Sequence, residues 1–180
     1  IAAGRPKSYA TAPDLTGLAP NANIYDVKVL NDFGFGTLSD TLEGIQWVIY
    51  HAKEYNIRVM NISLAMDSTD SWQYDPLCVA ARSAVAQGIT VVVAAGNFGR
   101  SLFGSEVYGS VSSPGNDPSV ITVGSANTKN TAVRNDDVIN TFSSRGPTRG
   151  AWFDAAGVHY PDNLLKPDLV APGNHVVGAL

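Results

Sequence analysis

The sequence has one cysteine, Cys78, so no disulfide can form within the chain. It has no uninterrupted apolar run long enough to predict a membrane-spanning helix. Basic residues are scarce: 12 Lys and Arg against 16 Asp and Glu give a net charge of −4, and no basic cluster occurs. This balance argues against a nucleic-acid partner or an anionic membrane surface. The 44% of hydrophobic residues, with 17 glycines and 10 prolines, are typical of a loop-rich globular domain or a piece of one.

Apolar segments alternate with helical patterns along the chain. Strands are predicted at residues 24–30, 57–64, 89–95 and 119–125. One helix is predicted between residue 37 and Ala52, capped by Thr37, Ser39 or Asp40, and a second from Asp75-Pro76 to residue 87. This order favours an α/β fold, a three-layer sandwich with a mainly parallel sheet flanked by helices. Right-handed crossovers would place the carboxyl ends of the strands at one edge, where such sheets bind ligands.

One polar side chain follows the most apolar of these strands. The run from residue 90 to Ala95 is succeeded by Gly96 and Asn97. A carboxamide in this place can donate an N–H to negative charge that develops on a substrate oxygen. The same pattern also suits an asparagine that caps a turn, and the residues alone leave both interpretations open.

Two other segments follow predicted strands. Gly34 and Gly36 come after the first strand, where small residues permit the close approach of an extended peptide. An ordinary flexible loop is the alternative, and a Gly-x-Gly without a third glycine is a poor phosphate site. The segment 61–66, Asn-Ile-Ser-Leu-Ala-Met, follows the second strand. No motif places a histidine beside Ser63, so we do not expect this serine to be a nucleophile.

These segments occur together with Ser-Pro-Gly at 113–115, an apolar run at 118–124, Phe-Ser-Ser-Arg-Gly-Pro at 142–147 and Lys-Pro-Asp-Leu-Val-Ala-Pro-Gly at 166–173. In this order, over about residues 17–175, the chain resembles the subtilisin-like serine proteases. The resemblance implies that Asn97 is the oxyanion asparagine. It also implies a set of peptide-binding residues: Leu30, Gly34, Phe35, Gly36 and Leu38 on one side of a channel, Ser63, Leu64 and Ala65 on the other, and Ala94, Ala95 and Gly96 before Asn97. Ala65 and Met66 replace two glycines of the family, which narrows the cleft or changes its specificity.

The segments that carry the family's catalytic triad, His-Gly-Thr-His, Asp-Thr/Ser-Gly and Gly-Thr-Ser-Met-Ala, do not occur in these 180 residues. His51 is expected on a solvated helix face and His159 and His175 in loops, and none lies in a motif that supplies a base. We therefore expect residues 1–180 to be the central part of one subtilisin-like peptidase domain, truncated at both ends. In this interpretation residues 1–23 are the loop after the histidine-bearing helix, and residues 24–180 are the sheet core and cleft.

The expected function is that of a serine endopeptidase in the intact protein, with the 180-residue chain inactive alone. A catalytically dead subtilase-like binding or scaffold domain is the alternative. A nucleotide-binding module is disfavoured because no phosphate loop follows any predicted strand. The expected partner is an extended peptide or protein substrate. A domain truncated at both ends would lack a helix and a strand that normally cover its sheet. This would expose a strand edge and apolar surface, so the chain is also expected to self-associate.

The sequence says less about metal binding and about the cellular location of the protein. The single cysteine and the absence of histidine pairs at helical spacing exclude a zinc constellation. The resemblance implies that calcium can bind the intact enzyme, and no other cofactor is expected. Asp117 and Asp168 are candidates for a weak cation site, with ordinary turn or surface carboxylates as the alternative. The resemblance favours secretion, and a cytoplasmic location stays open.

Overall fold

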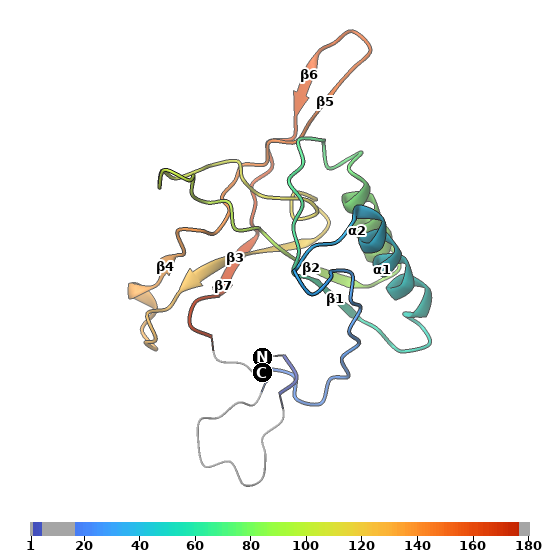
Figure 1. Cartoon of the computed structure of the whole chain (residues 1–180), viewed down its shortest axis with the longest axis vertical. Coiled ribbons are helices and arrows are strands. Elements are labelled where there is room, and N and C mark those ends of the chain that lie inside the picture. The colour runs from blue at the N-terminus through green and yellow to red at the C-terminus, as the bar shows by residue number, and fades with distance from the viewer. Residues whose placement is uncertain (1, 5–16, 177–180) are drawn as a thin grey trace.

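The computed structural model describes residues 2–4 and 17–176 of the chain. The predicted loop at residues 1–23 therefore lies largely outside the described residues. The described part forms helices and strands that Figure 1 labels along the chain. They are α1 (Leu38–His51), β1 (Val59–Ile62), α2 (Pro76–Ala86), β2 (Thr90–Ala94), β3 (Ile121–Asn127), the 3₁₀-helix η1 (Arg134–Asp136), β4 (Val138–Ile139), β5 (Ala151–Phe153), β6 (His159–Pro161) and β7 (Leu169–Pro172).

The main sheet is mostly parallel. Strands β1, β2 and β3 lie side by side in that order and run parallel, and β7 pairs parallel with β3. The short strand β4 runs antiparallel to β3, and β5 and β6 form a separate two-stranded hairpin that projects from the body (Figure 1). The predicted α/β class, a parallel sheet flanked by helices, is therefore confirmed. None of the described helices is both long and apolar enough to cross a lipid bilayer.

Local capping chemistry determines where both helices begin. Thr37 caps α1: its hydroxyl accepts from the Asp40 amide at 3.1 Å, and the Asp40 carboxylate accepts from the Thr37 amide at 3.0 Å. These contacts with the Thr37 hydroxyl and amide lower the pKa of Asp40. Asp75 caps α2, where its Oδ1 accepts from the amides of Leu77 at 2.9 Å and Cys78 at 3.1 Å, and Pro76 occupies the first helical position.

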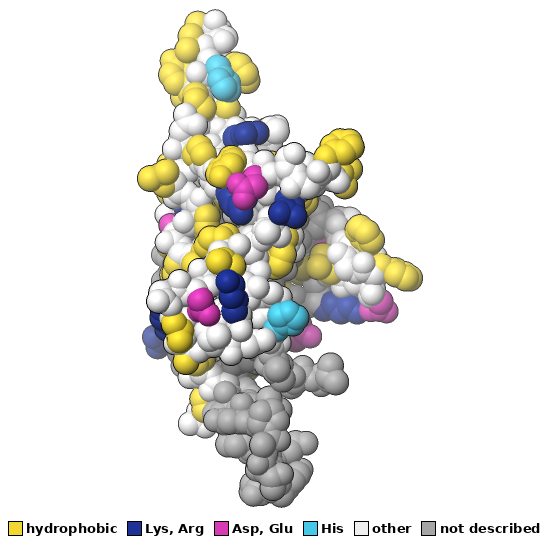
Figure 2. Space-filling view, turned by 90° about the vertical axis from the view of Figure 1, so that its left-hand side faces the viewer, with side chains coloured by type: hydrophobic (Ala, Val, Ile, Leu, Met, Phe, Trp, Pro, Cys, Tyr) yellow, Lys and Arg dark blue, Asp and Glu magenta, His cyan; other side chains and the backbone are white. Residues whose placement is uncertain are grey.

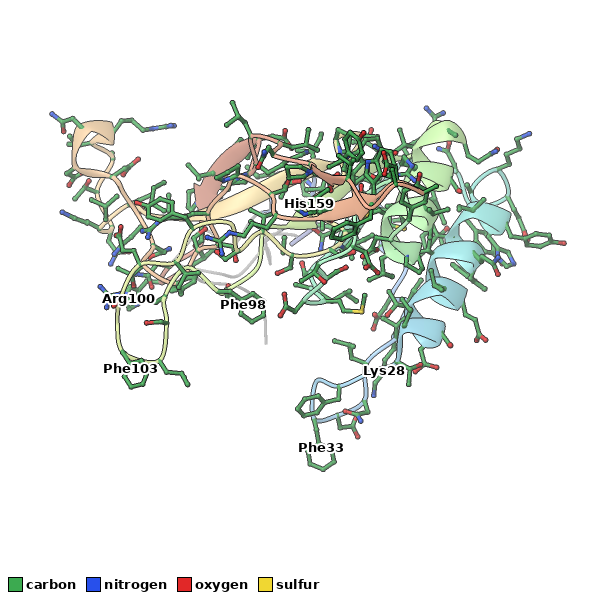
Figure 3. All side chains as sticks on the ribbon, turned by 90° about the horizontal axis from the view of Figure 1, so that it is seen from above. Lys28, Phe33, Phe98, Arg100, Phe103 and His159 are labelled. Carbon is green, nitrogen blue, oxygen red and sulfur yellow. The ribbon has the colours of Figure 1, made fainter. Side chains whose placement is uncertain are left out.

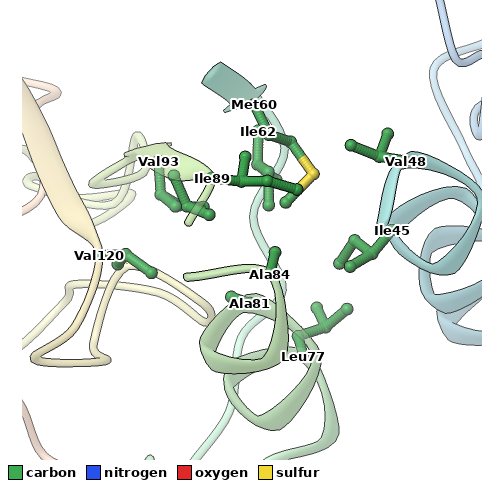
Figure 4. Close-up of a cluster of buried hydrophobic side chains, with 11 residues drawn as sticks. Ile45, Val48, Met60, Ile62, Leu77, Ala81, Ala84, Ile89, Val93 and Val120 are labelled. Atoms are coloured by element: carbon green, nitrogen blue, oxygen red, sulfur yellow. The ribbon is translucent and has the colours of Figure 1, made fainter. Parts of the chain in front are cut away.

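The hydrophobic core lies between β1, β2 and the residue before β3 on one side and the two helices on the other (Figure 4). Alternate residues of the strands point into it, so Met60 and Ile62 of β1 and Val91 and Val93 of β2 are buried while Val59 of β1 is exposed. The eleven buried members are Ile45, Val48, Met60, Ile62, Leu77, Ala81, Ala84, Ile89, Val91, Val93 and Val120. This core fixes the positions of β1 and β2, whose carboxyl ends carry the candidate site.

One strand prediction is wrong. Residues 24–30 form no strand among the described residues, because the segment has no ladder partner and β1 is the edge of the sheet. The segment packs by its side chains instead: Val27 lies against the core, and the rings of Tyr25 and Tyr55 stack with centroids 5.2 Å apart. Alternating apolar residues indicate a strand only where a neighbouring strand is available to pair with them.

Candidate active site

The carboxyl ends of β1 and β2 meet at one edge of the sheet. The two strands are parallel, with Ile62 opposite Val93, so the segments 63–66 and 94–97 leave the sheet next to one another. The sequence placed both segments at this edge, and the structure brings them together there. Ser63, Ala65 and Asn97 are exposed to solvent, whereas Ala95 is buried beneath them.

Gly96 determines the shape of the turn that carries Asn97. Its φ is +102°, in the region that favours glycine. A Cβ at this position would lie 2.7 Å from the Ser112 Oγ and 2.9 Å from the Ser144 Oγ, closer than real Cβ contacts. Any other residue at position 96 would therefore displace both serines as well as strain the backbone.

The backbone on both sides of Asn97 is held by Ser144. The Ser144 amide donates to the Gly96 carbonyl at 3.0 Å, and the Phe98 amide donates to the Ser144 Oγ at 3.1 Å. Ser144 itself is buried. The Asn97 side chain thus stands in solvent on a turn whose flanking peptide groups are already hydrogen-bonded. The backbone from which the carboxamide projects is therefore fixed before any substrate binds, as stabilisation by a preorganised donor requires.

Ser112 and Ser144 are site residues that sequence reasoning missed. Ser144 belongs to the segment 142–147, which was noted for its order along the chain and not for any contact with position 97. Ser112 is buried, and its amide donates to the Ala95 carbonyl at 3.1 Å. The sequence offers one signal for Ser144, the two serines within the turn-rich segment 142–147. That signal does not identify the residues that they contact.

The segment after β1 is held by backbone bonds. The Met66 amide donates to the Ser113 carbonyl and the Ser113 amide to the Met66 carbonyl, both at 3.0 Å. The Ser63 Oγ accepts from the Asn61 side-chain amide at 2.7 Å, which occupies this hydroxyl with a neighbour in sequence. Leu64 packs against the core, so Ser63 and Ala65 are the residues of this segment that can meet a ligand.

The loop before α1 is a compact turn. Asn31 closes it, because its Oδ1 accepts from the amides of Phe33 at 3.0 Å and Phe35 at 3.1 Å. Gly34 has a φ of +79°, and a Cβ on Gly36 would collide with the Val29 carbonyl. Gly34, Phe35 and Gly36 are exposed, whereas the two predicted pocket residues at its ends, Leu30 and Leu38, are half-buried.

The structure does not join this loop to the other two segments. Among the described residues no hydrogen bond links 34–36 to 63–66 or to 94–97, and Figure 3 shows the Phe33 loop standing away from the sheet. The sheet edge therefore brings together two of the three predicted cleft segments. The third contributes from a separate projection beside the helices.

The titratable side chains do not offer a nucleophile or an obvious base in the described part of the chain. Burial, and after it the Asp75 carboxylate, raises the pKa of the Cys78 thiol far above its ordinary value, so Cys78 stays protonated. His51 is half-buried, stacks on the Tyr55 ring and lies against the tilted Trp47 ring, contrary to the expected solvated face. His159 begins β6 instead of lying in a loop.

The two carboxylates proposed for a cation do not fit a calcium site. The Asp117 Oδ2 lies 2.6 Å from the Arg82 Nη1, and the Asp168 Oδ2 lies 2.6 Å from the Lys166 Nζ. The Lys166 ammonium also donates to the Val120 carbonyl at 2.9 Å, so side-chain cations already satisfy both acids. Nowhere in residues 2–4 and 17–176 do three His, Cys, Asp or Glu side chains gather where they could hold a metal ion together.

A groove of about 1070 Å³ lies elsewhere, between α1 and α2. Its lining is mainly apolar and includes Leu42, Trp47 and Tyr50 of α1 and Val79 of α2. It shares no lining residue with the segments 63–66 and 94–97, so it is separate from the candidate site.

Comparison with known proteins identifies the family of the chain. The profile described as "Subtilase family" matches residues 1–179, so the chain belongs to the subtilase family of serine proteases. "Serine protease AprX" of Bacillus subtilis (strain 168) is 40% identical over 166 residues, which cover 89% of this chain and 34% of that protein. "Subtilisin-like protease 1" of Arthroderma gypseum is 34% identical over 166 residues, covering 91% of this chain and 27% of that protein.

Solved structures show the same similarity. "Sphericase" superposes with a TM-score of 0.65 at 26% identity, covering 88% of this chain and 46% of that one. A second structure, a psychrophilic protease, superposes with a TM-score of 0.64 at 28% identity and the same coverage of 88% and 46%. The chain thus spans 27% to 34% of the length of these curated relatives and about half of the similar solved chains.

Proposed function

We propose that the intact protein that contains this chain is a serine endopeptidase, and that Asn97 is its oxyanion donor. The catalytic serine, histidine and aspartate then lie outside residues 1–180, in the parts of the protein that its longer relatives also possess. The observation that carries the proposal is the exposed Asn97 carboxamide, held between two backbone groups that Ser144 binds.

The chemistry requires a donor at this position. The serine oxygen attacks the carbonyl carbon of the scissile peptide, the serine proton passes to the histidine, and the carbonyl π electrons move onto the oxygen. An N–H of Asn97 would donate to that oxygen as its charge develops. When the tetrahedral intermediate collapses, the histidine returns the proton to the leaving amine nitrogen. Ser63 and Ala65 on one side, with Ala94 and Gly96 on the other, would line the extended peptide beside this centre.

Replacing Asn97 with alanine in the full-length protein tests the role. In subtilisin itself, loss of the oxyanion asparagine costs about 10²–10³ in kcat, and we take this magnitude over from the family. We expect a fall of that order in kcat for a fluorogenic peptide with KM little changed, because the interaction forms mainly in the transition state. Asn135→Ala, which alters another exposed asparagine in η1, is the matched control and should leave kcat unchanged.

The same preparation distinguishes the alternative of a binding domain without catalysis. If the full-length protein binds an extended peptide but does not cleave it, that result favours the alternative. Hydrolysis by the full-length protein with an Asn97→Ala variant of undiminished kcat would leave endopeptidase activity standing and remove the oxyanion role. The 180-residue chain alone is expected to cleave nothing.

A further inference from the structure

Ser144 binds the two peptide groups that flank Asn97. The Gly96 carbonyl and the Asn97 nitrogen share one peptide plane, and the Asn97 carbonyl and the Phe98 nitrogen share the next. Ser144 holds the first plane through its own amide, 3.0 Å from the Gly96 carbonyl, and the second through its Oγ, 3.1 Å from the Phe98 amide. The two planes meet at the Asn97 Cα. Because both are held, the direction in which the Asn97 side chain leaves the backbone is held as well.

The segment that carries Ser144 is anchored on both sides of this residue. On one side the Ser143 Oγ accepts from the amide of Ser125 in β3 at 3.0 Å. On the other side the Arg145 amide donates to the Ser110 Oγ at 3.1 Å, and the Ser110 amide donates to the Arg145 carbonyl at 2.9 Å. Ser144 itself is only 1% exposed. It therefore has a fixed position between β3 and the loop at residue 110, and the turn of Asn97 is bound to it.

The Phe98 amide depends on the Ser144 hydroxyl for its acceptor. The bond between them is partly buried. An N–H that loses its acceptor in such a place is driven to turn toward water, because an unsatisfied amide is unfavourable. A rotation of the peptide group between Asn97 and Phe98 would change ψ of Asn97 and move its carboxamide. Removal of one oxygen atom at position 144 would therefore misdirect the donor without any change at residue 97.

We propose that Ser144 is a positioning residue for the oxyanion donor, and that its amide and hydroxyl keep the Asn97 carboxamide aimed at the substrate oxygen. The inference rests on the proposed function, since the aim of Asn97 matters to catalysis only if Asn97 binds the developing charge. Ser144 acts through Asn97, because it is too deeply buried to meet the substrate itself. A preorganised donor is effective only in the correct place, and a displacement of about 1 Å is enough to lose much of its effect.

The test is a double-mutant cycle of Ser144→Ala and Asn97→Ala in the full-length protein, with kcat and KM measured on a fluorogenic peptide. We expect Ser144→Ala to lower kcat roughly tenfold with KM little changed, because the donor interaction forms mainly in the transition state. In the Asn97→Ala background the same change should cost nothing further in kcat, because the donor that Ser144 positions is gone. A serine that only supports the fold would change kcat by the same factor in both backgrounds.

Ser143→Ala is the matched control. Ser143 is the neighbour of Ser144, is 2% exposed and also uses its Oγ to accept from a backbone amide. Its partner is Ser125 in β3 and not the turn of Asn97. Ser143→Ala should therefore lower the urea midpoint about as much as Ser144→Ala does, but leave kcat unchanged.

Ser71→Ala is a second control, in another part of the fold. Ser71 is also 1% exposed, and its hydroxyl donates to the Asp162 Oδ1 at 2.6 Å. This pair lies at the base of the β5–β6 hairpin, which projects at the upper end of Figure 2. The change should lower the urea midpoint without lowering kcat. If Ser144→Ala does not fold, Ser144→Cys replaces it, since a thiol is close in size and a weaker acceptor. We then expect a smaller loss of kcat that is again absent in the Asn97→Ala background.

Hydrogen exchange of the Phe98 amide, followed by mass spectrometry, gives a readout that does not depend on catalysis. Exchange should be slow in the wild type and in Ser143→Ala, and roughly tenfold faster in Ser144→Ala. Equal exchange in all three proteins, an unchanged kcat in Ser144→Ala, or the same loss in both backgrounds would overturn the positioning role while the oxyanion role stands.

The proposed function can fail separately. If Asn97→Ala alone leaves kcat unchanged, the oxyanion role is wrong and the positioning role falls with it. If the wild type cleaves no peptide, the proposed function fails, and the exchange of the Phe98 amide alone decides whether Ser144 fixes the turn.

Discussion

Arg82 connects α2 to the loop beneath the candidate site, and its replacement by methionine should destabilise the fold. Its Nη1 donates to the Asp117 carboxylate at 2.6 Å and to the Trp72 carbonyl at 2.7 Å, and its Nη2 donates to the Gln73 carbonyl at 3.0 Å. The guanidinium also lies 4.9 Å from the centre of the Trp72 ring. Asp117 is completely buried, whereas the Arg82 side chain retains 27% exposure.

The magnitude follows from what Asp117 loses. Its other oxygen accepts from the Ser119 amide and hydroxyl, so after Arg82→Met the carboxylate keeps neutral donors but no cation. Breaking a buried ion pair from one side costs about 3–5 kcal/mol. Because the Arg82 head partly contacts water, we reduce this to about 2–4 kcal/mol, and methionine retains most of the packing of the aliphatic stem.

Urea unfolding of the full-length protein measures the loss. With the slope expected for a domain of this size, a destabilisation of that order lowers the midpoint by roughly 1 M or more. Arg100→Met is the control, since Arg100 is exposed and forms no ion pair among the described residues. A double-mutant cycle with Asp117→Asn should show coupling of at least about 1 kcal/mol. A change below about 0.5 kcal/mol for Arg82→Met, or strict additivity in the cycle, would refute the reasoning.

Two further predictions concern other buried groups. Lys166→Met should cost about 1–3 kcal/mol at neutral pH, since the Val120 carbonyl loses its donor, while the partly exposed Asp168 limits the loss. Partial burial raises the pKa of Asp168, but the hydrogen bonds from Lys166 and the Thr122 amide have the larger effect, so the pKa lies below 3.8. The stabilisation from the ionised Asp168 carboxylate is therefore present above pH 3.8 and is lost as the pH falls below that value. The difference in urea midpoint between wild type and variant should therefore become smaller in acid, leaving the part that comes from the Val120 carbonyl, and a difference that does not change with pH would contradict this assignment. Cys78 should resist iodoacetamide at pH 8 in the folded protein and react after urea is added, as mass spectrometry would show; rapid labelling without urea would mean that the thiol is neither buried nor protonated as described.

Features that depend on nearby residues could be predicted from the sequence. Asp75-Pro76 marks the start of α2, and the structure shows the cap bonds that such a pair makes. The sequence allows Thr37, Ser39 or Asp40 as the cap of α1, and the structure selects Thr37 with Asp40 as its partner. Strand β2 was predicted within one residue at each end, because a buried β-branched run between two glycines has few other interpretations.

Features that depend on distant partners could not be predicted. The segment 24–30 has the pattern of a strand, but no described strand lies beside it, and a pattern cannot report a missing neighbour. The sequence predicts a loop around His159, and the structure shows strand β6 there, because its pairing with β5 depends on a turn in which Asp154 accepts from the amides of Ala156 and Val158, both at 2.9 Å. Its base is held by Asp162, which accepts from Ser71, 91 residues away in the chain.

The candidate site shows the same division between local and distant information. The position of Asn97 after β2 is local, and the sequence contains it. The rigidity of its turn depends on Ser144, 46 residues after Phe98, and on a glycine whose missing Cβ leaves room for Ser112 and Ser144. A donor that stabilises developing charge must be oriented before the charge appears. The residues that hold the turn of Asn97 are therefore distant from it in the sequence. A polar residue after a strand supports a catalytic hypothesis only when such distant residues fix the turn that carries it.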